Sequence, residues 1–247
     1  MGSAPEPRDG AEPPTRTTGG RAGALVEILL CSDYPTQIGL AGLLGALGYG
    51  PLAGEPLTVP YVALLSLADT MLLLALIAMF LSAHGERARD VFLGTRSPWR
   101  EALVGLPFTF MALILGVAVL AGIQQVAPWL HTVEHNPLQD LIQTPRDAAV
   151  FAVVVVVAGG IREEIQRAFL LRRFERWMGG AGVGVVVTSV AFGAGHLVQG
   201  ADAAIATGLL GAFWSVIYLR RRSAVAPVVS HAGFNLLQLA QFFVSGR

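Results

Sequence analysis

Long apolar runs alternate with short polar segments along most of the chain, and this pattern indicates membrane-spanning helices. A helix needs about 20 predominantly apolar residues to cross the hydrocarbon core of a bilayer. These runs are too long and continuous for the strands of a membrane barrel, so the predicted fold class is all-α, a polytopic transmembrane helical bundle. We expect about seven spans, at 24–48, 58–83, 101–125, 147–171, 181–199, 203–219 and 225–245.

The first apolar segment is interrupted by the sequence SDYPT, where Pro35 is expected to break or kink a helix. Residues 1–23 ahead of it are rich in proline, glycine and charge, which predicts a disordered tail. We therefore divide the chain into this tail, N-terminal membrane helices over 24–146 and a four-helix membrane core over 147–247.

Composition supports the membrane assignment and suggests an orientation. Hydrophobic residues make up 53% of the chain and charged residues only 14%, against about 25% charged residues in soluble domains. All 17 basic residues are arginine, and 13 of them lie in the tail and in the links at 84–100, 172–180 and 220–224. Because positive charge favours the cytoplasmic side, we expect a cytoplasmic N-terminus in a bacterial inner membrane. The zero net charge gives no indication of nucleic-acid binding, and the single cysteine excludes an internal disulfide.

Costly polar side chains nevertheless lie inside three of the predicted spans. The fourth contains GGIREEIQR at 159–167, in which Glu163 and Arg167 share a helix face and Glu164 lies about 100° around the axis. An ionisable residue at membrane depth normally faces a partner or a cavity. The other two sets are Phe192 with His196, and His231 with Asn235, each pair four residues apart.

Each of these sets alone has a structural interpretation, as a buried ion pair or as hydrogen bonds between helices. Together they supply the groups that acid–base chemistry needs. A carboxylate near a histidine can deprotonate water, and histidine and asparagine on one face can donate to an oxyanion. The same groups allow a second arrangement, a zinc ion held by Glu163, His196 and His231.

Two glutamates and an arginine, then FxxxH, then HxxxN over three spans resemble the CPBP family of intramembrane proteases. The pattern of that family is EExxxR, FxxxH and HxxxN. This family includes the type II CAAX prenyl endopeptidases and bacterial relatives linked to bacteriocin self-immunity, and the resemblance covers about 147–247. The first motif departs from the family, because EEIQR has two residues rather than three between the glutamates and the arginine. Aligned on Arg167, the family's first glutamate falls on Arg162 and its second on Glu163. Aligned on the two glutamates instead, Arg167 lies one position early. The two alignments can hold together only with a local bulge in the helix.

The resemblance implies an intramembrane endopeptidase, a hydrolase of either the metallo or the glutamate type, that cuts a peptide or membrane-protein substrate near the membrane surface. We favour Glu163 as the base that activates water with His196, with Glu164 as the other candidate. No cofactor is favoured, and zinc is the minority alternative. The implied oxyanion donors are His231 and Asn235, and the implied supporting residues are Arg167 and Phe192.

Two alternatives to this function remain open at the level of sequence. One is a non-catalytic membrane scaffold or self-immunity protein of the same fold, in which the polar groups serve packing. The other is an ion or small-molecule carrier, which the lack of an internal repeat disfavours. The predicted spans also place Glu163 and His231 in the cytoplasmic half of the bilayer but His196 near the outer end of its span.

Overall fold

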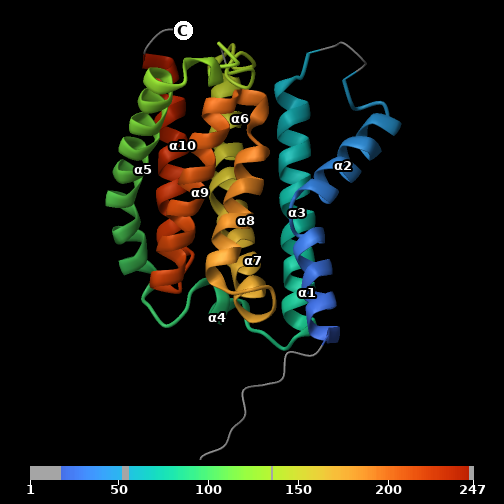
Figure 1. Cartoon of the computed structure of the whole chain (residues 1–247). Coiled ribbons are helices and arrows are strands. Elements are labelled where there is room, and N and C mark those ends of the chain that lie inside the picture. The colour runs from blue at the N-terminus through green and yellow to red at the C-terminus, as the bar shows by residue number, and fades with distance from the viewer. Residues whose placement is uncertain (1–17, 52–55, 135, 245–247) are drawn as a thin grey trace, which may run out of the picture.

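The computed structural model describes residues 18–51, 56–134 and 136–244, and every regular element within these ranges is helical. The long helices lie side by side along one axis, with α2 leaning away from the bundle (Figure 1). The predicted all-α helical bundle is therefore confirmed. In chain order the elements are α1 (Thr18–Leu30), α2 (Tyr34–Ala46), α3 (Val59–Ala83), α4 (Ala88–Phe92), α5 (Pro98–Val126), η1 (Pro128–Leu130), α6 (Pro145–Val154), η2 (Val155–Arg162), α7 (Glu163–Trp177), α8 (Ala181–Ala194), η3 (Leu197–Gln199), α9 (Ala201–Arg221) and α10 (Val225–Val244).

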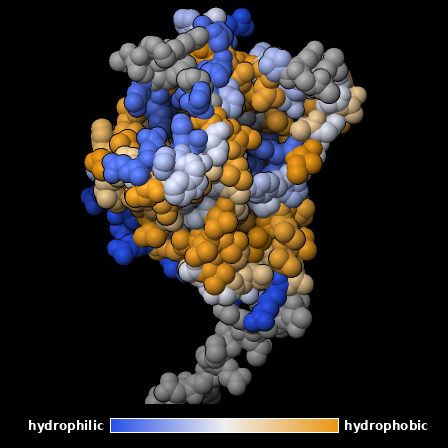
Figure 2. All heavy atoms as spheres, turned by 45° about the horizontal axis from the view of Figure 1, so that its top comes forward, coloured by the Kyte–Doolittle hydropathy of each residue, from blue (hydrophilic) through white to orange (hydrophobic). Residues whose placement is uncertain are grey.

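Three of the described helices, α3, α5 and α9, are long and apolar enough to cross a membrane, and α8 is a shorter apolar helix. Large apolar side chains on their outer faces are exposed, including Met71, Ile114 and Val190. Figure 2 shows hydrophobic residues over much of the side of the molecule, with hydrophilic residues at the end that comes forward and in a recess of that face. These features are those of an integral membrane protein. The number of seven spans stays a prediction.

The N-terminal part follows the sequence pattern with one correction. The expected break in the first apolar segment is confirmed, because α1 ends at Leu30 and α2 begins at Tyr34 with Pro35 in its first turn. The predicted disordered tail of residues 1–23 lies outside the described residues up to position 17. Residues 18–23, which we also assigned to the tail, instead form the start of α1, where they continue into the apolar helix.

The arginine-rich links lie together in space. The start of α1, helix α4, the α7–α8 link and the α9–α10 link all lie at the same end of the bundle (Figure 1). The clustering of these links at one end agrees with the arginine distribution from which we predicted the orientation of the chain. Which side of the membrane this end faces stays a prediction.

Small residues allow two pairs of helices to approach closely in the C-terminal half. A Cβ atom on Gly160 would lie 2.7 Å from the Cβ of Ala232, so η2 and α10 are in close backbone contact. A Cβ on Gly193 would lie 2.6 Å from the carbonyl oxygen of Ala204, which does the same for α8 and α9. These glycines therefore allow η2 to pack closely on α10 and α8 on α9.

Candidate active site

The two adjacent glutamates begin a regular helix that follows a widened one. Residues 155–162 form a π-helix, η2, and Glu163 and Glu164 are the first two residues of α7. Single π-helical turns within α-helices are frequent at functional sites. Gly159 and Gly160 in this segment leave room for α10, which carries His231 and Asn235. The bulge that the motif spacing called for therefore exists, but it precedes the glutamates and does not lie between Glu164 and Arg167.

Glu164 is buried in a network of two partners. Its Oε1 accepts a hydrogen bond from Nδ1 of His231 at 2.8 Å and also pairs with the guanidinium of Arg167, three residues along α7. The Glu164 side chain is 1% exposed and does not line the cavity described below. Because a carboxylate only accepts, Nδ1 of His231 carries the proton of this bond.

Glu163 has one occupied and one free carboxylate oxygen. Nη2 of Arg162 donates to its Oε1 at 3.3 Å, while Oε2 lies 3.8 Å from Nε2 of His231, too far for a direct hydrogen bond. The side chain is 15% exposed and lines the cavity. Of the two candidate bases, Glu163 is thus the one that lines the cavity.

His196 has a defined tautomer. Its Nδ1 lies 2.8 Å from the carbonyl oxygen of Phe192, which can only accept, so Nδ1 carries the proton and Nε2 is left as an acceptor. The ring also packs edge-on against Phe192, with ring centroids 4.8 Å apart. Phe192 in turn lies under the guanidinium of Arg167 and against His231. Phe192 therefore links the two histidines and the arginine by packing.

Asn235 and Trp214 complete the α10 side of the site. The amide nitrogen of Asn235 donates weakly to the carbonyl oxygen of Val155 in η2, at 3.4 Å. Trp214 stacks on His231 with ring centroids 3.7 Å apart, and its indole N–H donates to Ser230. The imidazole of His231 is thereby held in position from its face as well as from its edge.

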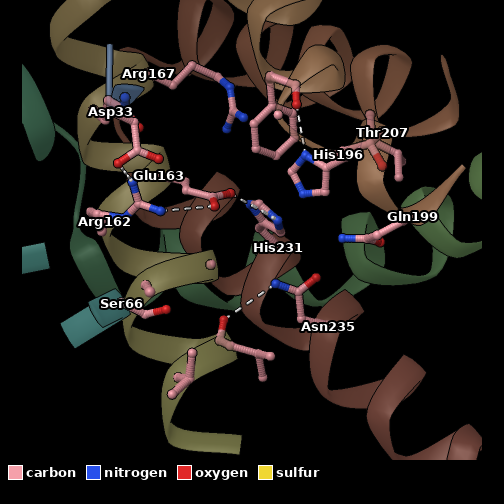
Figure 3. A pocket seen from close by; sticks show the side chains of 18 of the residues that line it. Asp33, Ser66, Arg162, Glu163, Arg167, His196, Gln199, Thr207, His231 and Asn235 are labelled. Atoms are coloured by element: carbon pink, nitrogen blue, oxygen red, sulfur yellow. Dashed lines mark hydrogen bonds and ion pairs between the residues drawn. The ribbon is translucent and has the colours of Figure 1, made fainter. Parts of the chain in front are cut away.

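These side chains surround one cavity of about 460 Å³. Figure 3 shows Glu163, His196, His231 and Asn235 converging on it from α7, the end of α8 and α10. α8 ends at Ala194 after 14 residues and the chain continues through η3, so His196 lies just beyond the end of α8. His196 lines the same cavity as Glu163 and His231, and their depth in the membrane stays a prediction. The cavity is lined by Glu163, Arg167, Phe192, His196, His231 and Asn235 of the predicted set.

Asp33 and Tyr34 line the same cavity, and Asp69 lies near its lining residue Arg162; none of the three was among the predicted site residues. Asp33 lies in the turn between α1 and α2, and its carboxylate lies 2.5 Å from Nη1 of Arg162. Asp69 of α3 lies 3.6 Å from the same nitrogen, and the hydroxyl of Tyr34 donates to the carbonyl oxygen of Ala191 in α8. A signal was available for Asp69, since it is an ionisable residue in the middle of a predicted span.

The zinc alternative of Glu163, His196 and His231 stays a prediction. Among the residues that the structure describes, no group of three or more His, Cys, Asp or Glu side chains has an arrangement that could hold a metal ion. Nε2 of His231 and Oε2 of Glu163 in the predicted zinc set lie 3.8 Å apart.

Comparison with known families supports the sequence resemblance. The model of the type II CAAX prenyl endopeptidase Rce1-like family matches residues 145–237. This part of the chain is similar to that family. At the level of the family, this match supports an intramembrane protease, a hydrolase with a peptide substrate in a membrane environment. Comparisons with curated proteins and with solved structures gave no match.

Proposed function

We propose that the protein is an intramembrane endopeptidase that hydrolyses a peptide bond near the membrane surface without a metal. The observation that carries the proposal is that the free oxygen of Glu163, both histidines and Asn235 border one cavity. We further propose that the chain lies in a bacterial inner membrane with its arginine-rich end in the cytoplasm, on the strength of the arginine distribution.

The reaction we propose uses water as the nucleophile. Oε2 of Glu163 accepts a proton from water while Nε2 of His196 accepts a second hydrogen bond that orients the molecule. The oxygen attacks the peptide carbonyl carbon, and the negative charge that develops on the carbonyl oxygen accepts a hydrogen bond from the amide of Asn235. Glu163 then returns the proton to the leaving nitrogen, so that water and peptide give a carboxyl and an amine.

His231 takes a conditional role in this scheme. Its Nδ1–H is engaged by Glu164, so Nε2 can donate to an oxyanion only when the ring is a protonated imidazolium. Glu164 and Arg167 act as supports that fix the ring and do not touch the substrate. We therefore propose Asn235 as an oxyanion donor in every protonation state and His231 as a donor only when its ring is protonated.

One observation favours a second function, a non-catalytic scaffold or self-immunity protein of the same fold. Both glutamates are paired with arginines, Glu163 with Arg162 and Glu164 with Arg167. Arg162 also contacts Asp33 and Asp69, and Glu164 contacts His231, so these charges also link separate helices. Catalysis is favoured because Glu163 keeps one oxygen unpaired on the cavity.

Cleavage of a quenched fluorescent peptide library by the detergent-solubilised protein distinguishes the two functions. Glu163→Gln is expected to lower kcat by about 10²- to 10⁴-fold, the usual contribution of a general base. Glu164→Gln serves as the matched control, because it removes a neighbouring charge that the substrate does not touch, and its loss is expected to be smaller. A wild type that folds but cleaves no library member favours the scaffold, and loss of activity with a chelator moves the case to zinc.

A further inference from the structure

Arg162 is a buried cation held between carboxylates from three parts of the chain. Its side chain is 5% exposed. Nη1 lies 2.5 Å from Oδ1 of Asp33 and 3.6 Å from Oδ2 of Asp69, and Nη2 donates to Oε1 of Glu163 at 3.3 Å. Figure 3 shows the guanidinium between Asp33 and Glu163, with the cavity beyond. Asp33 and Asp69 both lie outside the segment that matches the protease family.

Each residue of this arrangement is in an energetically unfavourable state unless its partners are present. A buried charge at membrane depth needs partners, and a pair broken on one side leaves the other charge unpaired. Asp69 is 1% exposed and has Arg162 as its ion-pair partner. Asp33 has a φ of 81°, in the left-handed region that residues other than glycine rarely adopt. Such strain persists only where the surroundings over-determine it, and it gathers at functional sites.

The position of Arg162 decides which oxygen of Glu163 faces the cavity. The planar guanidinium presents its nitrogens in a fixed geometry. With Nη1 fixed by the two aspartates, Nη2 engages Oε1 of Glu163 and leaves Oε2 toward His231. A free guanidinium would not distinguish the two oxygens.

The corner that carries Asp33 is itself anchored to the far side of the cavity. The next residue, Tyr34, donates a hydrogen bond from its hydroxyl to the carbonyl oxygen of Ala191 at 2.7 Å. Ala191 belongs to the last turn of α8, which leads into His196. The α1–α2 corner is therefore connected to both sides of the proposed water-activating pair.

We propose that Asp33 and Asp69 are positioning residues for Glu163 and act through Arg162. The N-terminal helices thereby complete an active site whose reacting groups all come from the Rce1-like segment. This inference rests on the proposed role of Glu163 as the base.

The test compares peptide cleavage by Asp33→Asn, Asp69→Asn and Arg162→Gln with wild type. We expect kcat to fall about 10- to 100-fold with KM within about 3-fold, because a misplaced base impairs chemistry more than binding. Arg162→Lys, which keeps the charge but lacks the planar fork, should recover only part of the loss. Glu101→Gln is the matched control, since it breaks an equally buried pair with Arg221 away from the cavity, and its kcat should stay within about 2-fold of wild type.

A double substitution separates positioning from general destabilisation. If Asp33 acts through Arg162, then Asp33→Asn should cost nothing further in the Arg162→Gln background. Independent losses that multiply would overturn the proposal. So would wild-type kcat in all three single variants while Glu163→Gln is inactive.

A readout without catalysis keeps the proposal testable if the wild type cleaves no peptide. In that case the proposed hydrolysis fails, and the coupling of Asp33 to Glu163 is measured by thermal unfolding of Asp33→Asn, Glu163→Gln and the double variant in detergent. We expect the loss in midpoint of the double variant to differ from the sum of the single losses, because both carboxylates share Arg162. Additive losses would show that Asp33 does not influence Glu163.

Discussion

Gly160→Ala tests the close contact that brings α10 to the glutamates. The added Cβ would lie 2.7 Å from the Cβ and 3.1 Å from the Cα of Ala232. Ordinary contact begins at 3.4 Å, so the two helices must separate locally by about 0.7 Å. No side-chain rotation relieves the clash, because a Cβ and the backbone it is attached to move together.

The expected cost falls on activity more than on stability. Overpacking a tight contact costs about 1–3 kcal/mol, and replacing glycine by alanine within a helix returns about 1 kcal/mol. The net loss is therefore about 0–2 kcal/mol. His231 and Asn235 lie one residue before and three residues after Ala232, so both move with α10 relative to Glu163. A misplacement of about 1 Å in an active site can cost about 100-fold, and we expect kcat to fall about 10- to 100-fold.

Thermal unfolding in detergent and peptide cleavage are measured on the same preparation. Gly182→Ala is the control, since it makes the same change in α8, where a Cβ would meet nothing within 4 Å. It should leave kcat unchanged and leave the midpoint equal or slightly raised. Wild-type kcat in Gly160→Ala with an unchanged midpoint would refute the idea that this contact sets the geometry of the site.

Three further predictions concern other parts of the fold. Burial alone would raise the pKa of Glu86, but Arg173 and two further arginines of α7 hold it below its ordinary value of 4.5. Glu86 therefore stabilises the fold above pH 4.5 and loses this effect as the pH falls through its lower folded-state pKa. The thermal-unfolding midpoint of Glu86→Gln should lie below that of the wild type at neutral pH, and this difference should disappear in acid. A difference that does not change with pH would contradict the prediction. Trp214→Ala should lower the free energy of unfolding by about 3–5 kcal/mol, and Trp214→Phe should lower it less, because only phenylalanine keeps a ring on His231. Equal losses of the two variants in thermal unfolding would argue against the stack. Tyr34→Phe should lower the free energy of unfolding by about 1 kcal/mol, because it removes one hydrogen bond to a carbonyl of α8. An unchanged thermal-unfolding midpoint would mean that this bond does not hold the α1–α2 corner.

Local features of the fold could be predicted from the sequence. A proline at the start of a helix restricts only its immediate neighbours, so the break before α2 followed from Pro35 alone. The end of α8 could not be predicted in this way, because VAFGAGHLV is apolar to its end. Gly200, with a φ of 116°, and the return of the chain through η3 end that segment early, and this turn depends on contacts with residues distant in sequence.

Candidate site residues were predictable where they form short motifs and were missed where they do not. Phe192 and His196, or His231 and Asn235, lie one helical turn apart and are recognisable as pairs. Asp33 and Asp69 have no such neighbour, and their partner Arg162 lies about 90 residues or more further along the chain. The packing of α3 against η2 brings Asp69 to Arg162, and α1, which ends just before Asp33, packs against α7.

The shortened motif explains why this chain needs those distant partners. The two residues between the glutamates and Arg167 lie in the regular helix α7, so Arg167 reaches Glu164 one turn away, and no bulge brings it equally to Glu163. Glu163 is paired instead with Arg162, at the last position of the π-helix. A second buried arginine requires further carboxylates, and the Rce1-like segment alone does not supply them. Asp33 and Asp69 supply these carboxylates. This is a physical reason for the site to include residues that precede position 145, where the family match begins.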